Sequence, residues 1–331
     1  MTDAQEPMAA RESLVLGSVF GGIQPSPHPT LVMLAGAPGA GAGRAIAQLR
    51  RAHRGELVPV SSEELQAFHP RYLDPGFRTS AVGQQDLSQA TALWLQACIA
   101  HARTSRYSLL LDGAFRSPET ALAVAQRFTD SGYQVHFVVV ATRRDESLLS
   151  TSSRGLRRMQ RRQASHIVTP AEHDRHIADV DALVAASAAG SAVDRLTVIG
   201  RRGQTILDAD RADASAMPNA SAAFRTASSE KMTALEATQW LSELRHMTDY
   251  ARSLHTLPDA ALESLIELHE IAIREVVPDL PVPPESEVVP IQLASLRSSL
   301  AALRQRADRH DSPDVAAPVV TPSTPGTSIS R

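Results

Sequence analysis

The sequence predicts an α/β protein: a parallel sheet with helices on both faces, followed by a C-terminal α-helical extension. Three observations support this fold class. Short apolar runs alternate with helical segments through the first two thirds of the chain. The first of these runs ends in a glycine-rich turn, and the last third carries three helical stripes. Strands that alternate with helices are typical of parallel sheets whose two faces are both covered.

The expected elements follow one another in a regular order. Residues 1–30 are interpreted as a leader, a weak helix and then a proline-rich loop. The expected strands span 30–35, 57–60, 108–112, 134–141, 195–199 and 204–207. The expected helices span 43–53, 86–103, 117–130 and 145–162, and another begins after its capping residue Thr169. These elements predict one domain over residues 31–208.

The chain changes character after residue 208. Residues 209–229 are rich in Ala, Ser, Asp and Asn with little periodicity, and we interpret them as a linker. Residues 230–308 contain three stripes of apolar side chains at helical spacings of three and four, which predict a helical extension. Residues 309–331 are rich in Pro, Ser and Thr, and we expect this tail to be disordered.

Composition argues against several classes of function. A net charge of -3 gives no electrostatic argument for binding nucleic acid or an anionic membrane. No apolar run approaches the ~20 residues that a membrane helix needs, and the N-terminus lacks the order of a signal peptide. Cys98 is the only cysteine, which fits a reducing compartment and favours a small buried hydrophobe over a catalytic thiol. We expect a cytoplasmic protein.

A glycine-rich segment connects the first expected strand to the first expected helix. It consists of Gly36, Ala37, Pro38, Gly39, Ala40, Gly41, Ala42, Gly43 and Arg44. Glycines let backbone N–H groups point inward, and a helix N-terminus favours an anion, so this is the frame of a phosphate-binding loop. The full motif is Gly-x-x-x-x-Gly-Lys-[Ser/Thr], and Gly36 and Gly41 have its spacing.

Two registers fit this loop. In the first, Ala42 and Gly43 stand where the motif has the lysine that contacts phosphate and the hydroxyl that holds Mg²⁺. In the second, a two-residue insertion places Arg44 at the lysine position, although a guanidinium is not equivalent to an ammonium. No lysine lies before Lys231.

Further segments follow the loop in a recognisable order. Residues 63–72 read Glu-Glu-Leu-Gln-Ala-Phe-His-Pro-Arg-Tyr, residues 111–116 read Leu-Asp-Gly-Ala-Phe-Arg, and Ser153-Arg154, residues 169–174 and residues 194–203 come after them. The loop and these segments resemble the zeta toxins, the UDP-N-acetylglucosamine kinases of bacterial toxin–antitoxin systems. The resemblance covers about residues 12–208 and implies a P-loop kinase-like sheet.

The resemblance also implies an activity and a set of site residues. The activity is phosphoryl transfer from ATP, with Mg²⁺, to a sugar hydroxyl of UDP-N-acetylglucosamine or a related sugar nucleotide. Glu63 is implied as the carboxylate base, and Arg116 and Arg154 as catalytic arginines. The implied substrate positions are Gln66, His69, Asp112, Ala114 and Arg116, and the implied phosphate positions are Gly36, Gly39, Ala40, Gly41, Ala42, Gly43 and Arg44. No metal-ligating side chain is assigned.

Several positions depart from the family pattern. Glu63 replaces an aspartate, Gln66 an arginine, Asp112 a glutamate and Ala114 a threonine, and the second lid arginine falls at His166 or Ile167. Purely structural roles also remain possible for these residues. Glu63 would then be an acid in the first turn of a helix, His69 would be part of a turn, and the arginines of 157–162 would form a solvated helix face. Each lost transition-state contact typically costs about 10²–10³ in rate.

We therefore expect a kinase with impaired or lost catalysis. The alternatives are a pseudokinase that binds nucleotide or UDP-sugar, and an interaction module regulated in cis by its C-terminal helices. The expected protein partner is an antitoxin-like helical protein, or those helices themselves.

Overall fold

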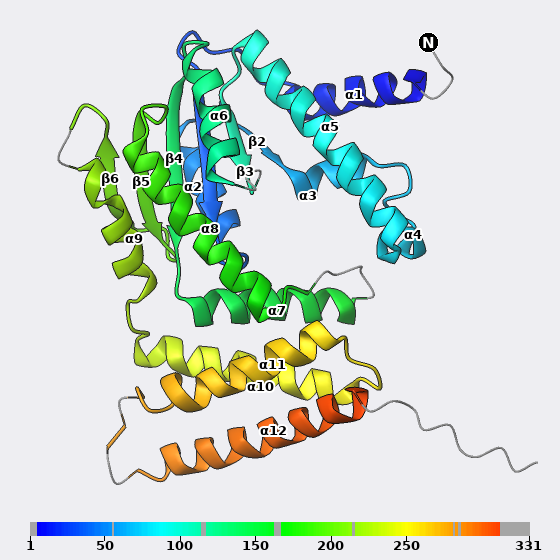
Figure 1. Cartoon of the computed structure of the whole chain (residues 1–331), viewed down its shortest axis with the longest axis vertical. Coiled ribbons are helices and arrows are strands. Elements are labelled where there is room, and N and C mark those ends of the chain that lie inside the picture. Colours follow the sequence, from blue (N-terminus) through cyan, green and yellow to red (C-terminus); the bar gives the residue numbers. More distant parts are fainter. Residues whose placement is uncertain are drawn as a thin grey trace, which may run out of the picture.

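The computed structural model describes residues 5–311, except 55, 114–116, 162–166, 214–215, 281 and 284–285. A six-stranded sheet with the order β2-β3-β1-β4-β5-β6 lies above the C-terminal helices in Figure 1. The first five strands are parallel, and β6 pairs antiparallel with β5. The strand bounds are β1 (Thr30–Gly36), β2 (Val58–Ser61), β3 (Leu109–Asp112), β4 (Gln134–Ala141), β5 (Arg195–Gly200) and β6 (Thr205–Asp210).

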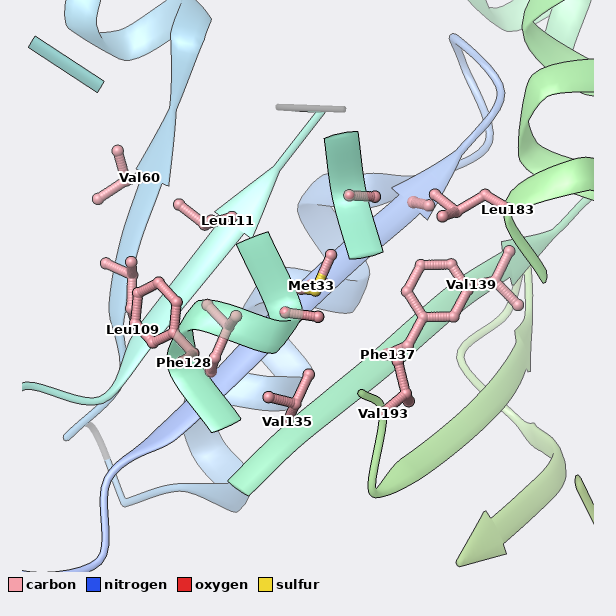
Figure 2. Close-up of a cluster of buried hydrophobic side chains, with 14 of the residues drawn as sticks. Met33, Val60, Leu109, Leu111, Phe128, Val135, Phe137, Val139, Leu183 and Val193 are labelled. Atoms are coloured by element: carbon pink, nitrogen blue, oxygen red, sulfur yellow. The ribbon is translucent and has the colours of Figure 1, made fainter. Parts of the chain in front are cut away.

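The strands form because their apolar runs are buried on both faces of the sheet. Leu31 and Met33 of β1 point to one face, and Val32 and Leu34 point to the other. Figure 2 shows the first face, where Met33 lies among side chains of β3, β4 and α6. Continuous apolar strands of this kind are typical of parallel sheets covered on both sides.

Helices cover both faces. The core of the first face includes side chains of α1 (Gln5–Phe20), α5 (Ala81–Ser105), α6 (Pro118–Thr129), α8 (Pro170–Ala189) and α9 (Ala220–Ser228). The second face is packed by Ala45, Ile46 and Leu49 of α2 (Ala42–Ala52). α8 begins after the expected cap: the Thr169 side chain accepts from the backbone of Glu172, whose carboxylate accepts from Thr169 in return.

Short elements connect β2 to α5. They are α3 (Ser62–Leu65), the 3₁₀ turn η1 (Gln66–Phe68) and α4 (Pro75–Thr79). Ser61 caps α3 by accepting a hydrogen bond from the Glu64 backbone, which begins this helix directly at the end of β2. The side chain of Glu63 is thereby placed at the carboxyl-terminal edge of the sheet.

The C-terminal helices pack beneath α7 (Arg144–Gln160), as Figure 1 shows. They are α10 (Ala234–Ser253), α11 (Asp259–Ile271) with the π-helical turn η3 (Ala272–Val276), and α12 (Val288–Asp311). Leu148, Leu149 and Leu156 of α7 share one core with Trp240 and Leu244 of α10. The predicted helical extension is therefore confirmed, and its core is continuous with α7.

The interpretation of residues 209–229 as a linker is wrong. β6 extends to Asp210, the 3₁₀ turn η2 (Met217–Asn219) follows, and α9 then packs on the sheet. Ala220 and Phe224, one helical turn apart, are buried there. The segment was missed because small side chains give a weak hydrophobic pattern, yet they let a helix approach a sheet closely. Most of the expected disordered tail, residues 312–331, lies outside the described residues, and 309–311 belong to α12.

Two further observations concern excluded functions. Cys98 is fully buried on α5, and burial raises the pKa of its thiol to about 12, so it packs as a hydrophobe. Within the described part of the chain, no helix is long and apolar enough to span a membrane.

Candidate functional site

The glycine-rich loop lies where β1 ends and α2 begins. Gly41 adopts a left-handed conformation with φ 106° and caps α2, whose first residue is Ala42. The Ala40 carbonyl accepts a hydrogen bond of 3.0 Å from the Thr142 hydroxyl, which ties the loop to the end of β4. The loop therefore has the strand, glycine turn and helix N-terminus of a phosphate site.

Helix α7 crosses directly over this loop. Gly39 has φ 87°, and a Cβ atom at this position would overlap the Ser147 carbonyl oxygen of α7. Only glycine allows both the left-handed backbone and this close approach. The loop is thus held between the sheet and α7.

The structure favours the first loop register. Because α2 starts at Ala42, Ala42 and Gly43 occupy the positions of the motif's lysine and hydroxyl residues. Arg44 lies in the first turn of α2, and its guanidinium donates to the Arg201 carbonyl at 3.3 Å. Arg44 thus reaches toward the turn after β5, while the loop itself offers backbone groups.

Two cavities open beside the loop. The first, which we call the α5 cavity, has about 1320 Å³ and lies between α5, α6, α7 and the ends of β2 and β3. Its lining includes Pro38 of the loop, Gln66 of η1, and Asp112 and Gly113 at the end of β3. It combines polar groups with an apolar wall formed by Leu87, Leu95 and Ile99 of α5, Val124 and Phe128. Such a mixture suits an organic ligand.

The second, which we call the arginine cavity, has about 1070 Å³ and lies between α2, α7, the β5–β6 turn and α10. Seven arginines and four glutamates line it: Arg44, Arg154, Arg157, Arg158, Arg161, Arg201 and Arg202, with Glu63, Glu146, Glu236 and Glu243. Clustered guanidinium groups are suited to phosphate. Arg157, Arg158 and Arg161, the described arginines of 157–162, therefore line this cavity, and their side chains are also exposed to solvent.

Three charged residues line both cavities. They are Glu63 of α3 and Arg154 and Arg158 of α7. Arg154 and Arg158 are one helical turn apart, so they lie on the same face of α7. The Arg158 guanidinium lies 2.7 Å from the Glu63 carboxylate. A carboxylate and two arginines thus stand where a group in one cavity would meet a group in the other.

Asp112 lies beside this junction. Burial, with smaller contributions from the carboxylates of Glu64 and Glu63, raises its pKa to about 6, while the charge of Arg154 opposes the shift. Its carboxyl group therefore takes up a proton near neutral pH more readily than an exposed aspartate does.

The remaining predicted substrate positions lie in different places in the structure. Gln66 lines the α5 cavity, whereas His69 is absent from the described lining of both cavities. His69 is buried, stacks on Phe77 and lies 3.5 Å from Asp86, so it stabilises the turn after η1. Ala114, Arg116 and His166 lie outside the described residues. Ile167 is buried in the core shared by α7 and the C-terminal helices.

Sequence reasoning did not assign the arginines of the β5–β6 turn to the site. Arg201 and Arg202 line the arginine cavity because this turn follows a parallel strand at its carboxyl end. Ligands bind at that edge of open α/β sheets, and this rule was the available signal. Glu236, Trp240 and Glu243 of α10 also line the cavity, and nothing in their sequence context marks them.

The loop does not fit Mg²⁺ in the manner of a phosphate-binding loop. The position of the Mg²⁺-binding hydroxyl is Gly43, which has no side chain to offer. Among the described residues, no three His, Cys, Asp or Glu side chains are grouped so as to hold a metal ion. The described residues therefore do not form a Mg²⁺ site of the phosphate-binding-loop type.

The curated protein Toxin PezT of Streptococcus pneumoniae serotype 4 is 25% identical over 136 residues, which is 41% of this chain and 54% of that protein. The match thus spans about half the length of this relative. A structure from the PezAT chromosomal toxin–antitoxin system of Streptococcus pneumoniae aligns with a TM-score of 0.63 at 18% identity, covering 76% of this chain and 98% of that one.

The structural likeness confirms the predicted fold, a P-loop kinase-like sheet with helices on both faces. A family model described as Zeta toxin matches residues 18–212. Since that match covers more than half of the chain, this protein belongs to the zeta toxin family.

Proposed function

We propose that this protein is an ATP-dependent phosphotransferase whose acceptor is a hydroxyl of UDP-N-acetylglucosamine or a related sugar nucleotide. ATP occupies the arginine cavity with its phosphates toward the glycine-rich loop, and the acceptor occupies the α5 cavity. The observation that carries the proposal is that Glu63, Arg154 and Arg158 line both cavities. The identity of the acceptor rests on family membership.

In this proposal the carboxylate of Glu63 accepts the proton of the acceptor hydroxyl. The hydroxyl oxygen attacks the γ-phosphorus of ATP, the bond to the β–γ bridging oxygen breaks, and ADP leaves. Arg154 and Arg158 stabilise the negative charge on the transferring phosphoryl group. Arg158 already holds the Glu63 carboxylate at 2.7 Å, so the base and an arginine meet at one point.

Transfer is expected to be slow, because the loop lacks both its lysine and its hydroxyl. Ala42 and Gly43 at these positions favour a second candidate function, nucleotide or UDP-sugar binding without transfer. The two functions share the same cavities and differ only in turnover.

One experiment separates them. Purified protein is given ATP with and without UDP-N-acetylglucosamine, binding is measured by calorimetry, and ADP release is followed in a coupled assay. We expect ADP release that depends on the sugar nucleotide. Binding of either ligand without ADP release would support the pseudokinase, and absence of any binding would contradict both functions.

The C-terminal helices are proposed to control this site in cis, in place of or together with an antitoxin-like partner. Glu236 of α10 pairs with Arg202, and Glu243 pairs with Arg157 at 2.6 Å, so two arginines of the cavity are occupied by α10. Removing α10–α12 would expose the apolar face of α7, so deletion is a poor test. Replacing Glu236 and Glu243 with glutamine should instead raise the affinity for ATP, and an unchanged affinity would contradict control by these pairs.

A further inference from the structure

The arginine cavity has a surplus of positive charge among the residues that the structure describes. Its four glutamates are each near an arginine: Glu63 at Arg158, Glu236 at Arg202, Glu243 at Arg157, and Glu146 at 3.9 Å from Arg201. The other three arginines, Arg44, Arg154 and Arg161, have no carboxylate within ion-pair distance in the described chain. Three guanidinium charges therefore remain for a ligand.

The same cavity offers little to a metal ion. Mg²⁺ in phosphate-binding loops is held by the loop hydroxyl and a nearby aspartate, and it demands near-ideal octahedral oxygen geometry. Here the hydroxyl position is Gly43, and the glutamates of the cavity are engaged with arginines. Asp112, the acid at the end of β3, lines the α5 cavity and is absent from the described lining of the arginine cavity.

We propose that this site binds the triphosphate of a nucleotide as the metal-free polyanion, with arginines of the cavity supplying the positive charge that a loop lysine and Mg²⁺ would otherwise supply. The inference rests on the proposed function, since it concerns how the same cavity takes ATP. Guanidinium groups bind phosphate oxygens through paired N–H donors and stay charged at all physiological pH values. Because Mg²⁺ cancels two of the ligand's negative charges, it weakens the attraction to a surplus of arginines instead of strengthening it.

The space around Gly43 allows the motif's missing side chains to be restored, which gives a second test of this inference. A Cβ atom at Gly43 would meet nothing within 4 Å, so a serine side chain fits there without strain. The double substitution Ala42→Lys with Gly43→Ser therefore restores the motif's side chains on the existing backbone. ATP binding by this double variant should depend on Mg²⁺, whereas ATP binding by the natural protein should not.

The experiment measures ATP affinity of the full-length protein by calorimetry, once in EDTA and once in excess MgCl₂. We expect binding in EDTA to be at least as tight as in MgCl₂. Arg154→Ala and Arg161→Ala should each weaken binding in EDTA by about tenfold or more, because each removes a charge-assisted hydrogen-bond donor to phosphate. Arg175→Ala, on the exposed surface of α8 and away from both cavities, is the matched control and should change nothing.

The outcomes are distinguishable from failure of the proposed function. ATP affinity that rises about tenfold when MgCl₂ replaces EDTA would overturn this inference and leave the phosphotransferase proposal standing. Metal-independent ATP binding without any ADP release would support this inference and contradict the proposed phosphotransferase activity. No binding in either buffer would overturn both. The Ala42→Lys, Gly43→Ser variant should bind more tightly in MgCl₂ than in EDTA, and the opposite order would overturn the role given to these two positions.

Discussion

Arg158 of α7 and Glu63 of α3 form an ion pair of 2.7 Å across the junction of the two cavities. Their side chains are 39% and 61% exposed, so the pair contributes little to the stability of the fold. Its consequence is geometric: the carboxylate that is proposed to accept the acceptor's proton is already held against an arginine that faces the phosphates.

Replacing Glu63 with glutamine should therefore reduce catalysis without reducing nucleotide binding. We expect sugar-dependent ADP release to fall by about 10²–10⁴, the range typical of a lost general base. ATP affinity measured by calorimetry should stay the same or rise, because Arg158 is freed. Glu64→Gln is the matched control, since Glu64 is the next residue but is absent from the described lining of both cavities. Equal rates for the two variants would contradict the assignment of the base.

Gly39→Ala should disrupt the loop. The left-handed backbone at φ 87° and the overlap of a Cβ atom with the Ser147 carbonyl both oppose any side chain here. The expected loss is about 1–3 kcal/mol in the free energy of unfolding, together with weaker ATP binding. Gly43→Ala is the control for stability, because its Cβ atom would meet open space. Denaturant unfolding of both variants tests this, and similar losses would argue against tight packing of α7 on the loop.

Asp112→Asn should change how stability depends on pH. Because burial raises the pKa of Asp112 to about 6, from 3.8 in the unfolded chain, the folded protein keeps this proton longer than the unfolded one. As pH rises from about 4 to about 6, the folded state therefore loses stability, by at most about 3 kcal/mol. Asparagine does not ionise, so its stability does not fall in this way. The free energy of unfolding of the variant, relative to that of the natural protein, should therefore rise between about pH 4 and about pH 6 and stay constant above that range. Urea unfolding at pH 4, 5, 6 and 7 checks this, and a difference that does not vary with pH would contradict it.

Trp240→Ala should destabilise the protein, because this side chain joins α10 to α7. Trp240 is 4% exposed, packs with the leucines of α7, and donates from Nε1 to the Asp145 carbonyl at 3.1 Å. The expected loss is about 3–5 kcal/mol. Leu235→Ala, five residues earlier on the same helix and 67% exposed, should cost little. A single cooperative unfolding transition whose midpoint falls in Trp240→Ala but not in Leu235→Ala would support this prediction. An unchanged midpoint in Trp240→Ala would mean that other contacts hold α10 in place.

The sequence predicted the order of elements well where the pattern was strong. β4 was predicted with its bounds, Thr169 was identified as a helix cap, and the stripe that contains Trp240 and Leu244 became the buried face of α10. It failed at α9, where Phe224 is the one large apolar side chain among small residues, so the helix shows little apolar periodicity. Glu63, Gln66 and Asp112 were picked out by motif, and the structure places all three around one cavity.

By itself the sequence determined the fold class, the family and the missing lysine and hydroxyl, because these depend on residue types at fixed spacing along the chain. Only the tertiary structure indicated the loop register, since the start of α2 depends on the left-handed backbone of Gly41 and on how Gly39 packs against α7. It alone brought Arg158 to Glu63, and Arg202 to Glu236 of α10. Contacts between residues far apart in the chain depend on how whole elements pack, and neither periodicity nor a motif carries that information.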